Sequence, residues 1–141
     1  MTEAEAIEAI SERWRSGWEQ AHPEIPYALH NEAFRPQDAS AAATVTFGPL
    51  VARQLTQGPI GARLFEYRGV INVKLYGPLD AGARQLAMLA GDVRAIFASQ
   101  TIGGAPGVEP VYSAAAGSVP GKEGKWATLL VPVPFDFTGR A

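Results

Sequence analysis

Two histidines, His22 and His30, are the residues in this sequence best suited to acid–base or metal chemistry. Glu32 and Asp38 lie close to His30, and these three side chains could form a metal site or an acid–base pair. No spacing places a third ligand on a defined helix or strand, as a stable metal site requires. We therefore interpret His30 as a loop imidazole among solvated carboxylates, and keep a site at His30, Glu32 and Asp38 as an alternative.

Other reactive patterns are absent from the sequence. It contains no cysteine, which excludes disulfides, thiolate metal sites and cysteine nucleophiles. No serine lies in the Gly-x-Ser-x-Gly pattern of acyl-transfer enzymes. The glycine-rich stretches 103–107 and 117–123 lack the spacing of nucleotide-binding loops, and Glu123 stands where a magnesium-binding Ser or Thr would be. The sequence therefore predicts no enzyme activity, no catalytic residue, no cofactor and no metal.

The charge balance argues against a protein that binds nucleic acid through phosphate neutralisation. The 141 residues include 12 Lys and Arg and 14 Asp and Glu, for a net charge of −2, whereas such proteins need clustered cations. Charged residues make up only 18%, against about 25% in typical soluble domains. The start of the chain lacks the features of a signal peptide, and the longest apolar run is shorter than the roughly 20 residues of a membrane helix. We expect a soluble single domain, residues 1–141, with part of its surface covered by partners.

Apolar residues at three- and four-residue steps predict two helices. The first begins behind Thr2, whose spacing to Glu5 is that of a capping box, and ends before Pro23. The second is capped by Asp80. Its predicted apolar face consists of Ala83, Leu86, Leu89, Ala90, Val93, Ile96 and Phe97.

Alternating residues predict the strands. Residues 27–29, 41–47 and 50–57 are extended, and 63–76 form one long strand in which Gly69 is a bulge or kink. Residues 108–116 are extended, 117–124 form a polar turn, and 126–137 form the last strand. The predicted fold class is α+β: a mainly antiparallel sheet with a long protruding β-hairpin and two helices packed on one face.

The long hairpin is predicted to reach beyond the rest of the domain. A 14-residue strand spans about 46 Å, whereas a compact chain of this length has a diameter of about 37 Å. Its tip is therefore expected to contact another subunit. Two prolines, Pro132 and Pro134, close one edge of the last strand to regular pairing. The predicted subunit-interface residues are Leu50, Val51, Arg53, Leu55, Ile60, Arg63, Leu64, Pro132 and Pro134.

The order and spacing of several groups of residues resemble the tail terminator-like family of tailed bacteriophages, prophages and gene transfer particles. The Gly- and Pro-rich stretch 103–107 and Pro49 depart from that pattern. The residues that carry the resemblance are Trp18, Pro26, Tyr27, Asn31, Phe34, Arg63, Phe65, Gly69, Val73, Pro78, Gly82, Leu86, Ala90, 93–97, Ile102, Gly103, 124–126, Val131, Val133, Pro134 and Phe135.

The resemblance implies a structural virion protein. Such a protein caps the end of the tail tube as an oligomeric ring, typically a hexamer, stops tube polymerisation and forms the joining surface to the head or neck. The implied partners are further copies of the chain, the tail tube protein and a neck, connector or stopper protein. DNA passes through the ring without specific binding. The implied location is the virion tail or neck, and the host cytoplasm during assembly.

Two alternatives remain open at this point. The first is another structural role, a head-completion or stopper protein or a minor tail protein. The second is a small α+β domain that binds a ligand or catalyses a reaction with His30, Glu32 and Asp38.

Overall fold

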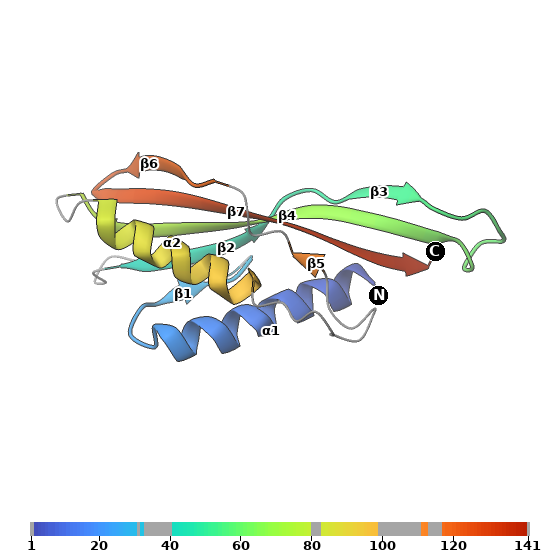
Figure 1. Cartoon of the computed structure of the whole chain (residues 1–141), viewed down its shortest axis with the longest axis horizontal. Helices are drawn as coiled ribbons and strands as arrows, with labels where there is room; N and C mark the ends of the chain where they lie inside the picture. Colours follow the sequence, from blue (N-terminus) through green and yellow to red (C-terminus); the bar gives the residue numbers. More distant parts are fainter. Residues whose placement is uncertain are drawn as a thin grey trace.

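A computed structural model describes residues 2–30, 32, 41–79, 83–98, 111–112 and 117–140. Both predicted helices and all the predicted strand regions that fall within these ranges are present (Figure 1). In chain order the elements are α1 (Glu3–Ala21), β1 (Tyr27–Ala28), β2 (Ala42–Phe47), β3 (Val51–Gln54), β4 (Leu64–Pro78), α2 (Ala83–Ala98), β5 (Val111–Tyr112), β6 (Val119–Glu123) and β7 (Trp126–Arg140).

The sheet is built around the antiparallel pair β4 and β7, which align from Leu64 opposite Arg140 to Pro78 opposite Trp126. The other edge of β4 pairs with β2 and then with β3, and the other edge of β7 pairs with β6 and β5. Among the described strands, β1 alone is parallel to its neighbour, β2. The chain is an α+β protein with a mainly antiparallel sheet, as the sequence predicts.

Both helices lie on the same side of this sheet (Figure 1). Alternate residues of β2, β4 and β7 point towards the helices, and Val45, Val73 and Val131 among them are completely buried. Trp14 and Trp18 of α1 stack with ring centroids 4.8 Å apart and fill the space beneath the sheet. The prediction of two helices packed on one face is confirmed.

The two helices approach each other closely at Gly17. A Cβ atom on Gly17 would lie only 2.7 Å from Cγ1 of Ile96 in α2. The Nε of Arg13 donates a hydrogen bond to the Ile96 carbonyl oxygen over 2.9 Å, one turn earlier on α1. The missing side chain of Gly17 therefore sets the spacing between the helices.

The protruding part of the sheet consists of β3, residues 64–69 of β4, residues 135–140 of β7 and the loop 55–63. We call it the sheet extension. With 15 residues, β4 spans about 50 Å. Its start continues beyond the N-terminal end of α1, which runs beneath the inner part of the extension (Figure 1). The extension has three strands instead of the predicted two, because β7 continues past Phe137 to Arg140 beside β4.

The sequence predicts a bulge or kink at Gly69, and this position is wrong. Gly69 pairs regularly with Phe135. The irregularity lies on the opposite strand, where three residues, 48–50, face two residues of β4 between the end of β2 and the start of β3. Gly69 is needed for another reason: a Cβ atom there would lie 2.8 Å from both Leu50 Cδ2 and Phe135 Cζ.

The polar turn predicted over 117–124 is also wrong for most of its length. Residues Val119–Glu123 form β6 and pair with β7, and the turn is confined to Gly124 and Lys125. All five residues of β6 are exposed, so no apolar alternation marks the strand. Backbone pairing with β7 and the ion pair of Glu123 with Lys74 hold it in place.

The structure alters one detail of the helix predictions and confirms Thr2 as the cap of the first helix. Ala83 is exposed and does not belong to the buried face of α2. Thr2 caps α1, and its side chain accepts a hydrogen bond from the Glu5 amide. Asp80 and residues 103–107 lie outside the described residues.

The outer edge of β7 carries a gap at its two prolines. This edge pairs with β6 from Trp126 to Leu130 and with β5 at Phe135 and Asp136. Among the residues that the structure describes, no strand pairs with the intervening stretch 131–134. Residues 113–116, which join β5 to β6, lie outside the described residues. That Pro132 and Pro134 close this edge stays a prediction, which rests on their lack of an amide that could donate a ladder hydrogen bond.

Candidate functional site

Stacked aromatic rings hold the sheet extension together on its helix side. The Tyr67 ring of β4 stacks on Phe137 of β7 with centroids 5.0 Å apart, and Phe65 lies 6.3 Å from Tyr67. Phe135 and Phe137 are parallel neighbours at 6.3 Å. Cross-strand aromatic pairs of this kind stabilise a sheet locally. The extension is therefore an ordered part of the fold.

Hydrogen bonds close the base of the loop 55–63. The Leu55 amide donates to the Leu64 carbonyl oxygen, and the Leu64 amide donates to Oγ1 of Thr56, both over 2.8 Å. The Gln54 side chain donates to the Thr56 carbonyl oxygen, also over 2.8 Å. The first bond continues the backbone ladder between β3 and β4, and the two bonds that involve side chains reinforce the start of the loop.

The outer part of the loop forms a tight turn that presents Ile60. The Ala62 amide donates to the Pro59 carbonyl oxygen over 3.1 Å, and Arg63 Nε donates to the Gly58 carbonyl oxygen over 2.8 Å. The Ile60 side chain is 87% exposed at this turn. We call residues 58–63 the tip.

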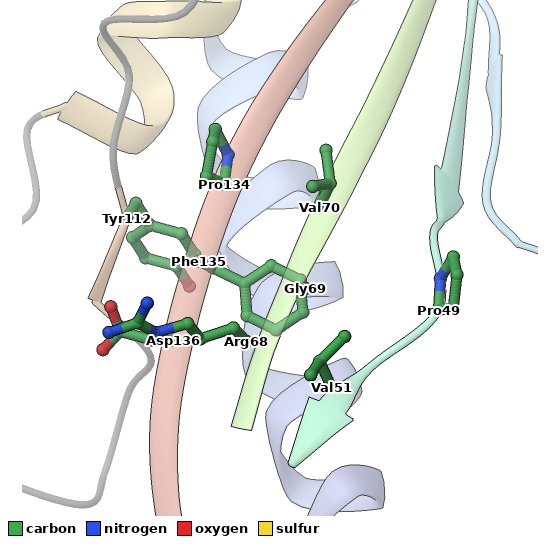
Figure 2. Close-up of a pocket in the computed structure, with 9 residues that line it drawn as sticks. All are labelled: Pro49, Val51, Arg68, Gly69, Val70, Tyr112, Pro134, Phe135 and Asp136. Carbon is green, nitrogen blue, oxygen red and sulfur yellow. The ribbon is translucent and has the colours of Figure 1, made fainter. Parts of the chain in front are cut away.

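A hollow of about 450 Å³ lies at the base of the extension and crosses β3, β4, β7 and β5 (Figure 2). We call it the basal hollow. Its walls are mostly apolar, and Arg68 and Asp136 are its two charged residues. The nine lining residues are Pro49, Val51, Arg68, Gly69, Val70, Tyr112, Pro134, Phe135 and Asp136.

The charges around the basal hollow are unevenly paired. Glu66 lies 2.7 Å from Arg68 and 3.6 Å from Arg53, so one carboxylate serves two cations. Asp136 has no cation within ion-pair distance in the described part of the chain. Burial raises the pKa of Asp136 most, and the negative charge of Glu66 raises it further. The positive charge of Arg68 acts in the opposite direction. The Asp136 carboxylate is the poorly neutralised charge of the hollow.

The predicted interface residues fall into three groups. Leu55, Ile60 and Arg63 lie in the loop 55–63, while Val51 and Pro134 line the basal hollow. The remaining four have other surroundings. Arg53 pairs with Glu66, Leu50 packs partly against the core, and Leu64 and Pro132 are half-buried.

Sequence reasoning missed the hollow itself, and with it Gly69, Tyr112 and Asp136. One signal was present: Asp136, between Phe135 and Phe137, is the single carboxylate in the otherwise apolar run 129–137. Alternation alone could not indicate that Tyr112 lies beside it, because this contact joins separate parts of the chain.

The alternative site at His30, Glu32 and Asp38 gains no support from the described residues. His30 is exposed, and its ring lies 5.5 Å from that of Phe47. Glu32 accepts a hydrogen bond from the Leu29 amide, and Asp38 lies outside the described residues. Within the described ranges, no three His, Asp or Glu side chains are grouped as a metal ion would require.

A second hollow, of about 430 Å³, lies between the end of α1 and α2. On its wall, Nε2 of His22 lies 2.6 Å from Oδ2 of Asp92, and the His22 ring packs against Trp18. This contact ties the end of α1 to α2. It explains His22 as a structural residue.

Comparisons with known proteins add the fold alone. No protein-family model and no curated protein matches the chain. The structure is similar to 23 solved chains. One of them, whose name states no function, matches with a TM-score of 0.61 and 20% identity, over 96% of this chain and 95% of the other. No helix in the described part of the chain is long and apolar enough to cross a membrane.

Proposed function

We propose that this chain is a structural virion protein that caps the end of a phage tail tube. Several copies form a ring on the last ring of the tube, stop its polymerisation and provide the joining surface to the head or neck. The sequence resemblance is the first support. DNA passes through the ring, and a net charge of −2 suits a lumen that does not retain it.

The sheet extension is the observation that carries the proposal. It reaches beyond the helices with three paired strands, an ordered loop and an exposed Ile60. A projecting surface on one part of a chain and a different surface elsewhere can make a head-to-tail contact, and such a contact closes into a ring when its rotation is suitable. A closed ring also has two different faces, one for the tube and one for the neck.

Tube assembly in solution tests this function. Purified chain is added to polymerising tail tube protein, and tube lengths and end densities are compared by electron microscopy with those of tube protein alone. We expect shorter tubes with extra density at one end, and a mass in solution of several 15.0 kDa chains.

Two results would contradict the proposal. One is a chain that stays monomeric and leaves tube length unchanged. The other is binding to a neck or connector protein without binding to tubes, which would favour a head-completion or stopper protein.

A further inference from the structure

We propose that the tip of one copy docks into the basal hollow of the next copy, with the Ile60 side chain in the hollow and Arg63 paired with Asp136. This inference rests on the proposed ring function and adds the contact that would close the ring. The occupant of the hollow is thus a second copy of this chain.

The tip is ordered without being part of the core. Its hydrogen bonds join backbone and side chains within the loop and its flanking strands. Ordering a residue costs about 1–2 kcal/mol of conformational entropy, and a loop already held in one shape loses less on binding. Ile60 is thus presented on a preorganised turn, as expected of a side chain that enters a partner.

The basal hollow has the matching chemistry. Six of its nine lining residues are apolar or aromatic, and it is open to solvent on the surface of the extension. The tip carries one ionisable side chain, the Arg63 guanidinium. Its Nε donates a hydrogen bond to the Gly58 carbonyl oxygen. In the described part of the chain no carboxylate pairs with Arg63, and no cation pairs with Asp136 within ion-pair distance. Arg68 lies opposite Asp136 across β4 and β7, but its ion pair is with Glu66. Arg63 and Asp136 therefore lie on the two surfaces as a cation and a carboxylate of which neither has an ion pair in the described residues.

The tip cannot fill the hollow of its own chain. Leu64, where the loop ends, and Gly69, in the hollow, are separated by five residues of the paired strand β4, or about 17 Å. The tip lies further out still. Because tip and hollow are different surfaces, their contact is heterologous and propagates from copy to copy.

Charge exchange between two variants tests the contact. We expect R63D and D136R each to weaken self-association at least about thirtyfold, because each places like charges in contact. An equimolar mixture should regain it, since the tip of R63D meets the hollow of D136R and the tip of D136R meets the unchanged hollow of R63D. Sedimentation velocity gives the masses.

Two further variants separate docking from general surface effects. I60D should abolish self-association, whereas V119D should leave it unchanged. Val119 is a matched control because it is also an exposed apolar residue, 57% exposed, but lies on β6 outside the proposed contact. Circular dichroism and the unfolding midpoint show whether each variant is folded. The inference is overturned if the chain is monomeric at every concentration, if I60D assembles normally, or if the mixture of charge variants fails to reassociate.

The contact and the ring function fail in distinguishable ways. If the charge variants behave as expected but the assembled chain never binds tube ends, the contact stands and the capping function is wrong. If I60D and R63D assemble and cap tubes as the unchanged chain does, the contact is wrong and the capping function stands. If I60D assembles but no longer binds tubes, the tip binds the tube protein and the inference is overturned.

Discussion

At the scale of single residues, two glycines in helices have opposite surroundings. Gly17 faces Ile96 at a distance that leaves no room for a methyl group, whereas a Cβ atom on Gly91 of α2 would meet nothing within 4 Å. In a helix interior, alanine is more favourable than glycine by about 1 kcal/mol. At Gly17 this gain competes with overpacking against a buried, β-branched side chain, which costs about 1–3 kcal/mol.

The same substitution should therefore change stability in opposite directions at these two positions. We expect G91A to raise the free energy of unfolding by about 1 kcal/mol and G17A to lower it by about 1 kcal/mol, the difference between the propensity gain and the overpacking cost. Urea unfolding followed by tryptophan fluorescence measures both. A G17A chain at least as stable as the parent would show that α1 and α2 do not approach as closely as described.

The raised pKa of Asp136 makes the stability of the fold depend on pH. Since its pKa is raised in the fold, the folded chain holds this proton more tightly than the unfolded chain does. The protonated Asp136 therefore adds to the free energy of unfolding at low pH, and this contribution is lost as the pH rises through the pKa of the folded chain. At neutral pH the ionised carboxylate destabilises the fold. A cation supplied by a partner would relieve it, as the proposed pairing with Arg63 does.

At the scale of elements, the sequence predicts the strands whose apolar residues alternate and the helices whose apolar residues recur at three- and four-residue steps. The odd-numbered apolar residues of β4 and β7 predict the central pair, and two prolines predict the gap beside 131–134. The strand β6 was missed, because its five exposed residues have no apolar alternation and the strand is defined by pairing with β7. Gly69 was misread, because the reason for a glycine there lies in Leu50 and Phe135, which come from other strands. The basal hollow was missed for the same reason.

The elements should also differ in local stability. Residues 71–76 of β4 lie between β2 and β7 over a buried core, whereas β3 is an edge strand with all four residues exposed. We expect the β3 amides of the isolated chain to open at a free energy at least about 2 kcal/mol below that of the Val73 amide, roughly thirtyfold faster exchange. Hydrogen exchange measures this, and equal protection of the β3 and Val73 amides would contradict the expectation that the edge strand β3 opens before the central strand.

At the scale of the whole molecule, the fold separates a compact body from a projecting one. The helix α2 covers the half of the sheet that contains β2, α1 continues beneath the inner part of the other half, and the tip lies at the far end of that half (Figure 1). Each copy thus offers one tip and one hollow. A chain that lacks either can take part in only one contact, which allows the length of an assembly to be controlled.

Replacing residues 55–63 by a two-residue turn should remove the tip and leave the core intact, since the hydrogen bonds that close the base of the loop and shape its turn lie within the extension. This trimmed chain keeps its hollow, so that it can accept a tip without offering one. The variant D136R has a tip and an impaired hollow. Each alone should be monomeric, and their mixture should form a heterodimer and nothing larger, because the D136R tip docks into the trimmed chain and no further contact remains. Light scattering coupled to size-exclusion chromatography distinguishes this from ring-sized species, which would require a contact that involves neither the tip nor the basal hollow.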